Sequence, residues 1–164
     1  GVQTCALPIS AGTDPDRAMI RRTEFASGLR VVSERMPGVR SVALGFWVLA
    51  GSCDEPPDIS GSSHFLEHLL FKGTSSRSAQ DIAEAFDAVG GNLNAYTAKE
   101  TTVFHARILD RDLPMAVAHL ADMFRDSTLR PADLEAERQV ILEEINMYED
   151  APDELVHDLF QETL

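Results

Sequence analysis

The stretch "SVALGFWVLAG", residues 41–51, gives the clearest indication of the fold. Every second residue from Val42 to Val48 is a large apolar one, and this period of two is typical of a β-strand. The intervening residues are also largely apolar, which is typical of a strand covered on both faces. We therefore expect residues 41–48 to form a central, covered strand.

Working outward from this strand, turn residues divide the preceding chain into short segments. Ser27 and Gly28 separate two strand-like stretches. The first begins near Thr23, and the second contains Val31 and Val32. A Pro-Gly pair at 37–38 ends this second stretch. These features predict two short strands before the one at 41–48.

The chain after residue 51 carries helix signals on both sides of another strand pair. Ser78 with Asp81 three residues later is the pattern of a capping box, and Gly90 is a typical helix stop. Pro114 and Pro131 are suited to the first turns of two further helices. The expected elements are helices at 63–71 and 78–90, strands at 92–98 and 101–109, and helices at 114–125 and 131–148. This order predicts an α+β fold, with helices covering a mostly antiparallel sheet.

Composition limits the classes of function. The 164 residues, 44% of them hydrophobic, suit one domain or most of one. The 14 basic residues against 27 acidic ones give a net charge of −13, which argues against a nucleic-acid partner. The longest apolar run is too short to span a membrane. Cys5 and Cys53 form neither a disulfide framework nor a Cys-x-x-Cys zinc motif.

The two ends of the sequence predict an incomplete chain. Residues 1–9, "GVQTCALPI", show no structural period and fit neither a signal peptide nor a transit peptide. Read back into codons they resemble a sequencing adapter, so we interpret 1–9 as a translation artefact and 10–164 as an incomplete N-terminal domain. The final stretch, "APDELVHDLFQETL", lacks a helix stop signal. We expect this sequence to be part of a longer protein.

The sequence "HFLEH", residues 64–68, places polar groups in an otherwise apolar helix. On a helix, His64, Glu67 and His68 share one face. Two imidazoles four residues apart can hold one tetrahedral zinc ion, while Glu67 beside them can take a proton from water. The alternative is a pair of half-exposed histidines on an amphipathic helix. A charged trio within so apolar a segment favours the metal site.

A third zinc ligand is available on the helix predicted at 131–148. Glu137 and Glu144 each follow a large apolar residue of that helix, Leu134 and Ile141, by three positions. They therefore fall within its apolar stripe, where a carboxylate is costly unless paired or bound to a metal. Glu143 remains a rival ligand, because sequence alone does not fix the rotational phase of a helix.

Three stretches together resemble the pitrilysin/insulinase family of zinc metallopeptidases. They are "HFLEHLLFKGT" at 64–74, with the inverted H-x-x-E-H zinc motif of the inverzincins, "GGNLNAYTAKETT" at 90–102 and "ERQVILEEI" at 137–145. Within the family the likeness is greatest to the processing peptidases and their bacterial relatives, and it extends from about Thr23 to the end. Glu144, 76 residues after His68, stands where the family has its third ligand, and Glu137 stands where it has a supporting glutamate.

The resemblance implies a zinc-dependent endopeptidase with one Zn²⁺ per catalytic half, acting on unfolded or presequence-like peptides. Asn94, Ala95, Tyr96 and Thr97 would belong to the strand that receives the peptide as an added strand. A homologous second half, on the same chain, on a partner subunit or in a homodimer, would close the structure as a clamshell. The implied location is the bacterial cytoplasm, or the mitochondrial matrix in a eukaryote. The alternative function is that of a non-catalytic core or scaffold subunit with the same fold.

Overall fold

The computed structural model describes residues 20–163, and the chain divides into two compact units, Gly1–Val39 and Arg40–Leu164. In the first unit, strand β1 (Ile20–Glu24) pairs with β2 (Arg30–Glu34) as an antiparallel hairpin. Gly28 sits in the turn with φ of 87°, a left-handed conformation that glycine adopts without strain. Both predicted strands are present, although the first runs from Ile20 to Glu24 rather than beginning near Thr23. The adapter-like residues 1–9 lie outside the described residues.

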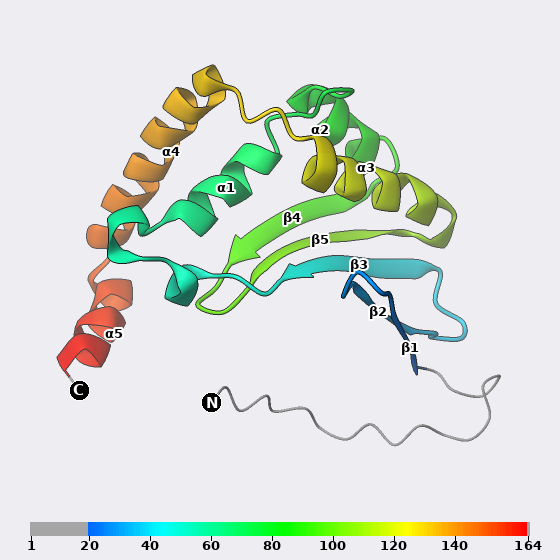
Figure 1. Cartoon of the computed structure of the whole chain (residues 1–164), viewed down its shortest axis with the longest axis horizontal. Coiled ribbons are helices and arrows are strands. Elements are labelled where there is room, and N and C mark those ends of the chain that lie inside the picture. The colour runs from blue at the N-terminus through cyan, green and yellow to red at the C-terminus, as the bar shows by residue number, and fades with distance from the viewer. Residues whose placement is uncertain (1–19, 164) are drawn as a thin grey trace. The chain divides into compact units, whose positions relative to one another are not determined.

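The second unit is built on a three-stranded antiparallel sheet of order β3-β5-β4 (Figure 1). Its strands are β3 (Ser41–Val48), β4 (Asn92–Thr97) and β5 (Thr102–Leu109). The prediction that β3 is central was wrong, because β3 forms an edge of this sheet and Trp47 on its outer face is 63% exposed. The apolar pattern reports which side chains are hydrophobic, but pairing with β5, more than 50 residues away, decides the order of the strands.

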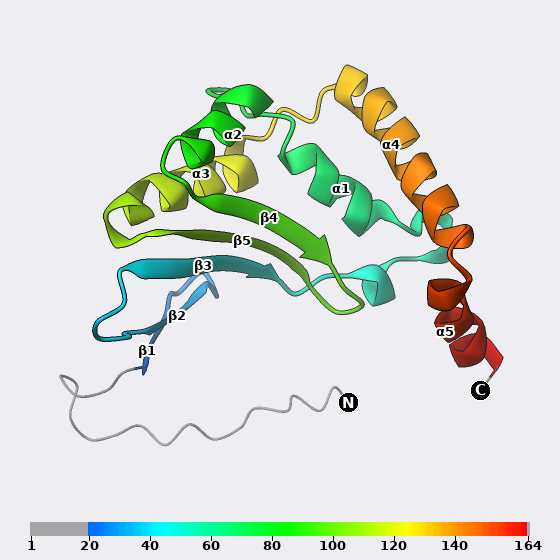
Figure 2. The same cartoon turned by 180° about the vertical axis from the view of Figure 1, so that it is seen from behind.

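The described part of this unit contains five α-helices, and three of them cover one face of the sheet. The five helices are α1 (Ser62–Leu70), α2 (Ala79–Asp87), α3 (Leu113–Asp126), α4 (Pro131–Glu149) and α5 (Pro152–Thr163). Figures 1 and 2 show α1, α2 and α3 over the same face of the sheet, with α4 alongside α1. The four predicted helices are confirmed, as is the α+β class. Among the described residues, no helix combines the length and apolar character needed to cross a bilayer.

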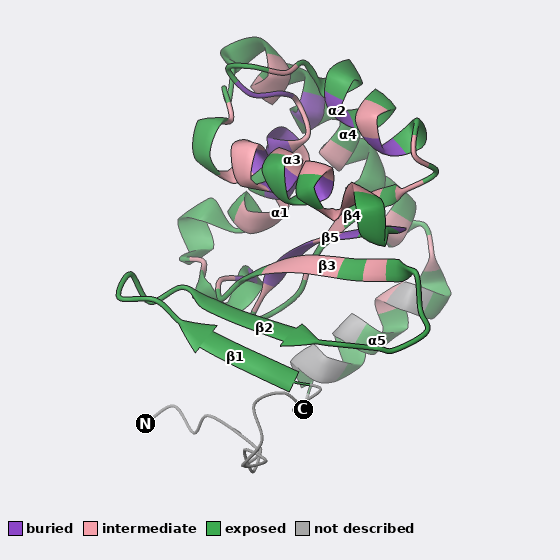
Figure 3. Ribbon diagram, turned by 90° about the vertical axis from the view of Figure 1, so that its right-hand side faces the viewer, coloured by how far each residue is buried: buried purple, intermediate pink, exposed green. Residues whose placement is uncertain are grey.

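The hydrophobic core fills the space between β5 and the helices (Figure 3). Phe124 of α3 stacks on Phe46 of β3, with ring centroids 5.4 Å apart, and meets Phe104 of β5 edge-on at 4.9 Å. The buried cluster consists of Leu70, Ile82, Phe86, Phe104, Ala106, Ile108, Ala116, Leu120 and Met123. This packing fixes α1 against the sheet, and α1 carries the predicted site.

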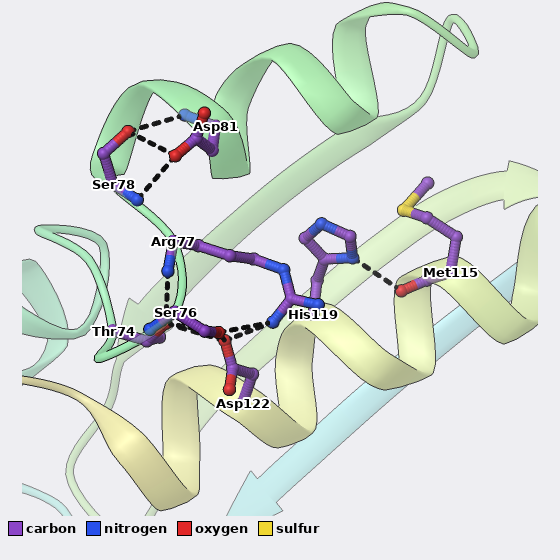
Figure 4. Close-up of polar contacts among 8 residues, drawn as sticks. All are labelled: Thr74, Ser76, Arg77, Ser78, Asp81, Met115, His119 and Asp122. Carbon is purple, nitrogen blue, oxygen red and sulfur yellow. Dashed lines mark hydrogen bonds and ion pairs between the residues drawn. The ribbon is translucent and has the colours of Figure 1, made fainter.

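The connection from α1 to α2 is anchored to α3 by one carboxylate (Figure 4). Oδ2 of Asp122 accepts hydrogen bonds from Thr74 Oγ1 at 2.7 Å and from Ser76 Oγ at 3.0 Å, and it pairs with Arg77. The Thr74 hydroxyl is the largest cause that holds the pKa of Asp122 below its ordinary value. Directly afterwards Ser78 caps α2, accepting from the Asp81 N–H at 3.1 Å, as the sequence predicts.

Replacing Asp122 with asparagine is expected to lower the free energy of unfolding at neutral pH. The pKa of Asp122 is lowered in the folded state. Its contribution to the free energy of unfolding is therefore fully present above the pKa of the unfolded chain, ~3.9, and is lost as the pH falls through the lower pKa of the folded state. The difference in the free energy of unfolding between wild type and Asp122→Asn should therefore become smaller as the pH falls into that range. Urea unfolding at a series of pH values measures it. Asp126→Asn, on the same helix, is the control. A gap that does not change with pH would contradict the prediction.

Candidate metal centre

The first turn of α1 is held by a side chain from the preceding loop. Gly61 before the helix has φ of 89°, and the carboxylate of Glu55 accepts from the N–H groups of Gly61 and Ser63, both at 2.6 Å. Burial opposes the ionisation of Glu55, but the side-chain hydrogen bond from Ser63, together with these backbone bonds and one from the Ser62 hydroxyl, outweighs it and holds the pKa of Glu55 below its ordinary value. The helix that carries His64 and His68 therefore begins at a fixed place.

Three donor atoms converge between α1 and α4. Nε2 of His64 lies 3.2 Å from Nε2 of His68, and Oε2 of Glu144 lies 3.6 Å from the first and 3.5 Å from the second. Ligand atoms ~2.0–2.1 Å from a zinc ion lie about 3.3–3.4 Å apart in a tetrahedron. The sides of this triangle therefore fit three ligands of one tetrahedral ion.

The imidazole of His68 is oriented by a buried glutamate. Oε2 of Glu137, a residue only 5% exposed, lies 3.1 Å from Nδ1 of His68. A carboxylate can only accept a hydrogen bond, so the proton of the imidazole sits on Nδ1. The lone pair of Nε2 then faces the other two potential metal ligands, His64 and Glu144. Nζ of Lys72 lies 2.6 Å from the other oxygen of Glu137 and balances its charge. Lys72 was not predicted as a site residue, although it stands only four residues after His68, in the turn that follows α1.

Glu67 lies next to the donor group without belonging to it. The residue is 9% exposed, and its Oε2 accepts a hydrogen bond of 2.5 Å from the hydroxyl of Thr97 on β4. Among the described residues, the group of donors that could hold a metal consists of His64, His68 and Glu144. A buried carboxylate beside such a group, with one oxygen already bonded, is suited to proton transfer rather than to metal ligation.

Glu137 and Glu144, the two glutamates of α4 that were predicted to face the core, differ in burial. Glu137 is buried, whereas the side chain of Glu144 is 46% exposed. Glu137 packs behind His68, while Glu144 lies two turns further along α4 beside the more exposed imidazole of His64. The expectation of two core-facing carboxylates thus holds for Glu137 alone. Glu143 is exposed and stands outside the donor group.

The predicted substrate strand, residues 94–97, forms the free edge of the sheet at β4. The bond from Ala98 N–H to Thr101 C=O, at 2.8 Å, closes the β4–β5 hairpin. Because hydrogen-bonded and non-bonded pairs alternate in an antiparallel ladder, the backbone groups of Ala95 and Thr97 face away from β5. The Ala95 N–H donates at 2.8 Å to the side-chain oxygen of Asn94. Two of the four predicted residues thus have backbone groups that face the free edge of the sheet.

Sequence comparison identifies the family of a chain with these features. Residues 30–164 match the family described as insulinase, peptidase family M16. The chain belongs to the M16 peptidase family. The match covers all three stretches that carry the resemblance, and it includes both histidines and all three glutamates of the site.

Two curated relatives and one solved structure show what this chain is similar to. It is 53% identical over 145 residues to an uncharacterised zinc protease of Streptomyces coelicolor, covering 88% of this chain and 32% of that protein. It is also 53% identical over 141 residues to one of Bacillus subtilis, covering 86% and 34%. The crystal structure of a Helicobacter pylori protease is similar, with a TM-score of 0.79 and 26% identity over 83% of this chain and 33% of the other. The chain spans about a third of the length of the curated relatives it matches.

Proposed function

We propose that this M16 chain carries the catalytic site of a zinc-dependent endopeptidase. The observation that supports the proposal is the triangle of His64, His68 and Glu144 donors, with the buried carboxylate of Glu67 beside it. The relatives named as zinc proteases support the same metal. We assign one Zn²⁺ to the three donors, and we assign Glu137 the orientation of His68.

Zinc held by these donors would supply Lewis acidity, which polarises a peptide carbonyl and acidifies water. Glu67 acts as the general base, accepting the proton of the attacking water at Oε1, the oxygen not bonded to Thr97. The same carboxyl group then donates that proton to the leaving amine. Glu137 keeps the proton of His68 on Nδ1, so that Nε2 remains a lone-pair donor.

The edge of β4 supports a mode of peptide binding. A peptide laid along this edge can pair with the backbone groups of Ala95 and Thr97, adding a strand to the sheet. Its carbonyl would replace the oxygen of Asn94 at the Ala95 N–H. Because these bonds involve backbone only, the edge selects extended, unfolded peptides such as presequence-like segments rather than one sequence. Asn94 and Tyr96, both exposed, are placed to contact alternate side chains.

The whole protein is proposed to be a two-half enzyme. The relatives are about three times as long as this chain, which leaves length for a second, homologous half. That half would lie on the same chain or come from a partner subunit or second copy. A non-catalytic scaffold subunit is the competing function. Such a subunit has no need of Glu67, whose buried carboxylate stands beside the donors without joining them.

The experiment that tests the proposed function uses the full-length protein with a pool of internally quenched random peptides. We expect hydrolysis with one zinc per catalytic half, loss of activity with a chelator, and recovery when zinc is restored. Chelation should also lower the melting temperature, because the metal binds only the folded protein. Zinc binding without any hydrolysis would support the scaffold function. Hydrolysis that survives complete removal of metal would overturn the zinc mechanism.

A further inference from the structure

We propose that Thr97 is a positioning residue, whose hydroxyl fixes the Glu67 carboxylate relative to the bound peptide. The inference rests on the proposed function and adds a residue to it. It comes from one contact: the Thr97 hydroxyl donates to Oε2 of Glu67 at 2.5 Å, joining β4 to α1 across 30 residues of sequence.

The side chain and the backbone groups of Thr97 face different parts of the structure because of its position in β4. Its side chain points to the helix-covered face, as do those of Leu93 and Ala95, which are half-buried like Thr97 itself. Its backbone groups point to the free edge, by the alternation that follows from the Ala98–Thr101 pair. One residue therefore contacts the proposed base with its hydroxyl and offers its backbone to the peptide.

The hydroxyl leaves the Glu67 carboxylate little freedom. Glu67 is 9% exposed, so water does not easily replace a lost partner, and a bond from a hydroxyl to a carboxylate is among the stronger neutral–charged contacts. Fixing Oε2 orients the plane of the carboxylate and thereby aims Oε1. The backbone of Thr97 also helps to set the register of the bound peptide. Thr97 therefore controls the distance from the Glu67 carboxylate to the scissile carbonyl. Misplacement by 1 Å costs about 10²-fold in rate.

The rival interpretation is that Thr97 only stabilises the packing of α1 on β4. This role predicts losses in folding and zinc binding that follow the loss of activity. A positioning role predicts a fall in kcat with zinc content and peptide affinity retained. The two can therefore be separated by measurements other than activity.

The test compares Thr97→Val with Thr97→Ser in the full-length protein. Valine keeps the shape but removes the donor, whereas serine keeps a hydroxyl. For Thr97→Val we expect kcat to fall about 10- to 100-fold with little change in KM, and for Thr97→Ser less than about threefold. Zinc content and melting temperature should match wild type in both. The affinity of the zinc-free protein for a fluorescein-labelled unstructured peptide should also be unchanged.

A double-mutant cycle completes the test. In a Glu67→Gln background, Thr97→Val should have little further effect, because the carboxylate through which Thr97 acts is gone. Equal losses in both backgrounds, equal losses for valine and serine, or zinc lost in parallel with kcat would each overturn the positioning role. Failure of the proposed function has a different signature: the wild-type protein would then lack zinc-dependent hydrolysis altogether.

Discussion

Turnover by the full-length protein is expected to fall about 10²- to 10⁴-fold when Glu67 is replaced by glutamine. The amide has nearly the same size and can still accept the bond from Thr97, but it cannot take up a proton at the pH of the reaction. His64, His68 and Glu144 keep their positions, because Glu67 is not one of the three converging donors. Zinc content should therefore remain that of the wild type, as measured by atomic absorption alongside initial rates on quenched peptides.

Two outcomes would contradict this role for Glu67. Loss of zinc in Glu67→Gln would mean that the carboxylate belongs to the metal site or supports its fold. Undiminished turnover at full zinc occupancy would remove Glu67 from the chemistry. Glu143→Gln is the matched control, because Glu143 is an exposed acid on α4 outside the donor group, and it should leave turnover unchanged.

Replacing Glu144 with alanine is expected to weaken zinc binding more than about 100-fold. This exceeds the upper end of the 10- to 100-fold cost of losing a residue that only supports a ligand. Glu144 supplies one corner of the triangle, within 3.6 Å of both imidazole nitrogens, and no neighbouring acid replaces it in the described donor group. Competition with a chromophoric zinc chelator measures the change. Because the side chain of Glu144 is half-exposed, the fold should tolerate the substitution.

The adjacent glutamate makes this test specific. Glu143→Ala removes the same charge one position earlier, from an exposed residue outside the donor group. We expect its zinc affinity to match wild type within about twofold, since surface substitutions of this kind have small effects. If Glu143→Ala loses zinc and Glu144→Ala keeps it, Glu143 is the ligand and the rotational phase of α4 is not the one that places Glu144 beside the histidines. Equal losses in both would mean that overall charge, not ligation, controls binding.

Much of the fold follows from local sequence. The Ser78–Asp81 capping box predicts the start of α2, because both partners lie within one helical turn. The β4–β5 hairpin is predicted because its strands are adjacent in the chain. The order of the strands is not local: β5 lies between β3 and β4, so β3 becomes an edge strand despite its apolar run. Periodicity identifies a strand but not its neighbours.

The site shows the same limit. The positions of His64, Glu67 and His68 on one helix face follow from spacing alone. The role of Glu137 beside His68 follows from the family resemblance, whereas its ion pair with Lys72 depends on how α4 packs against α1. The contact of Thr97 with Glu67 likewise joins segments 30 residues apart. The sequence places Thr97 in the strand proposed to bind the peptide but carries no sign of its contact with Glu67.

The hydrogen bond between Asn94 and the Ala95 N–H also bears on self-association. Exposed strand edges with unpaired N–H groups template aggregation, and proteins suppress this by covering or blunting such edges. At β4 the Oδ1 of Asn94 already accepts from the Ala95 N–H, one of the outward-facing backbone donors with which a second copy could pair. This is a single hydrogen bond between neighbouring residues, so a tightly bound peptide can displace it. Because the bond is intramolecular, it does not depend on the concentration of the protein. The bond thereby disfavours pairing between the β4 edges of two copies, while the same edge can still take the peptide proposed as substrate.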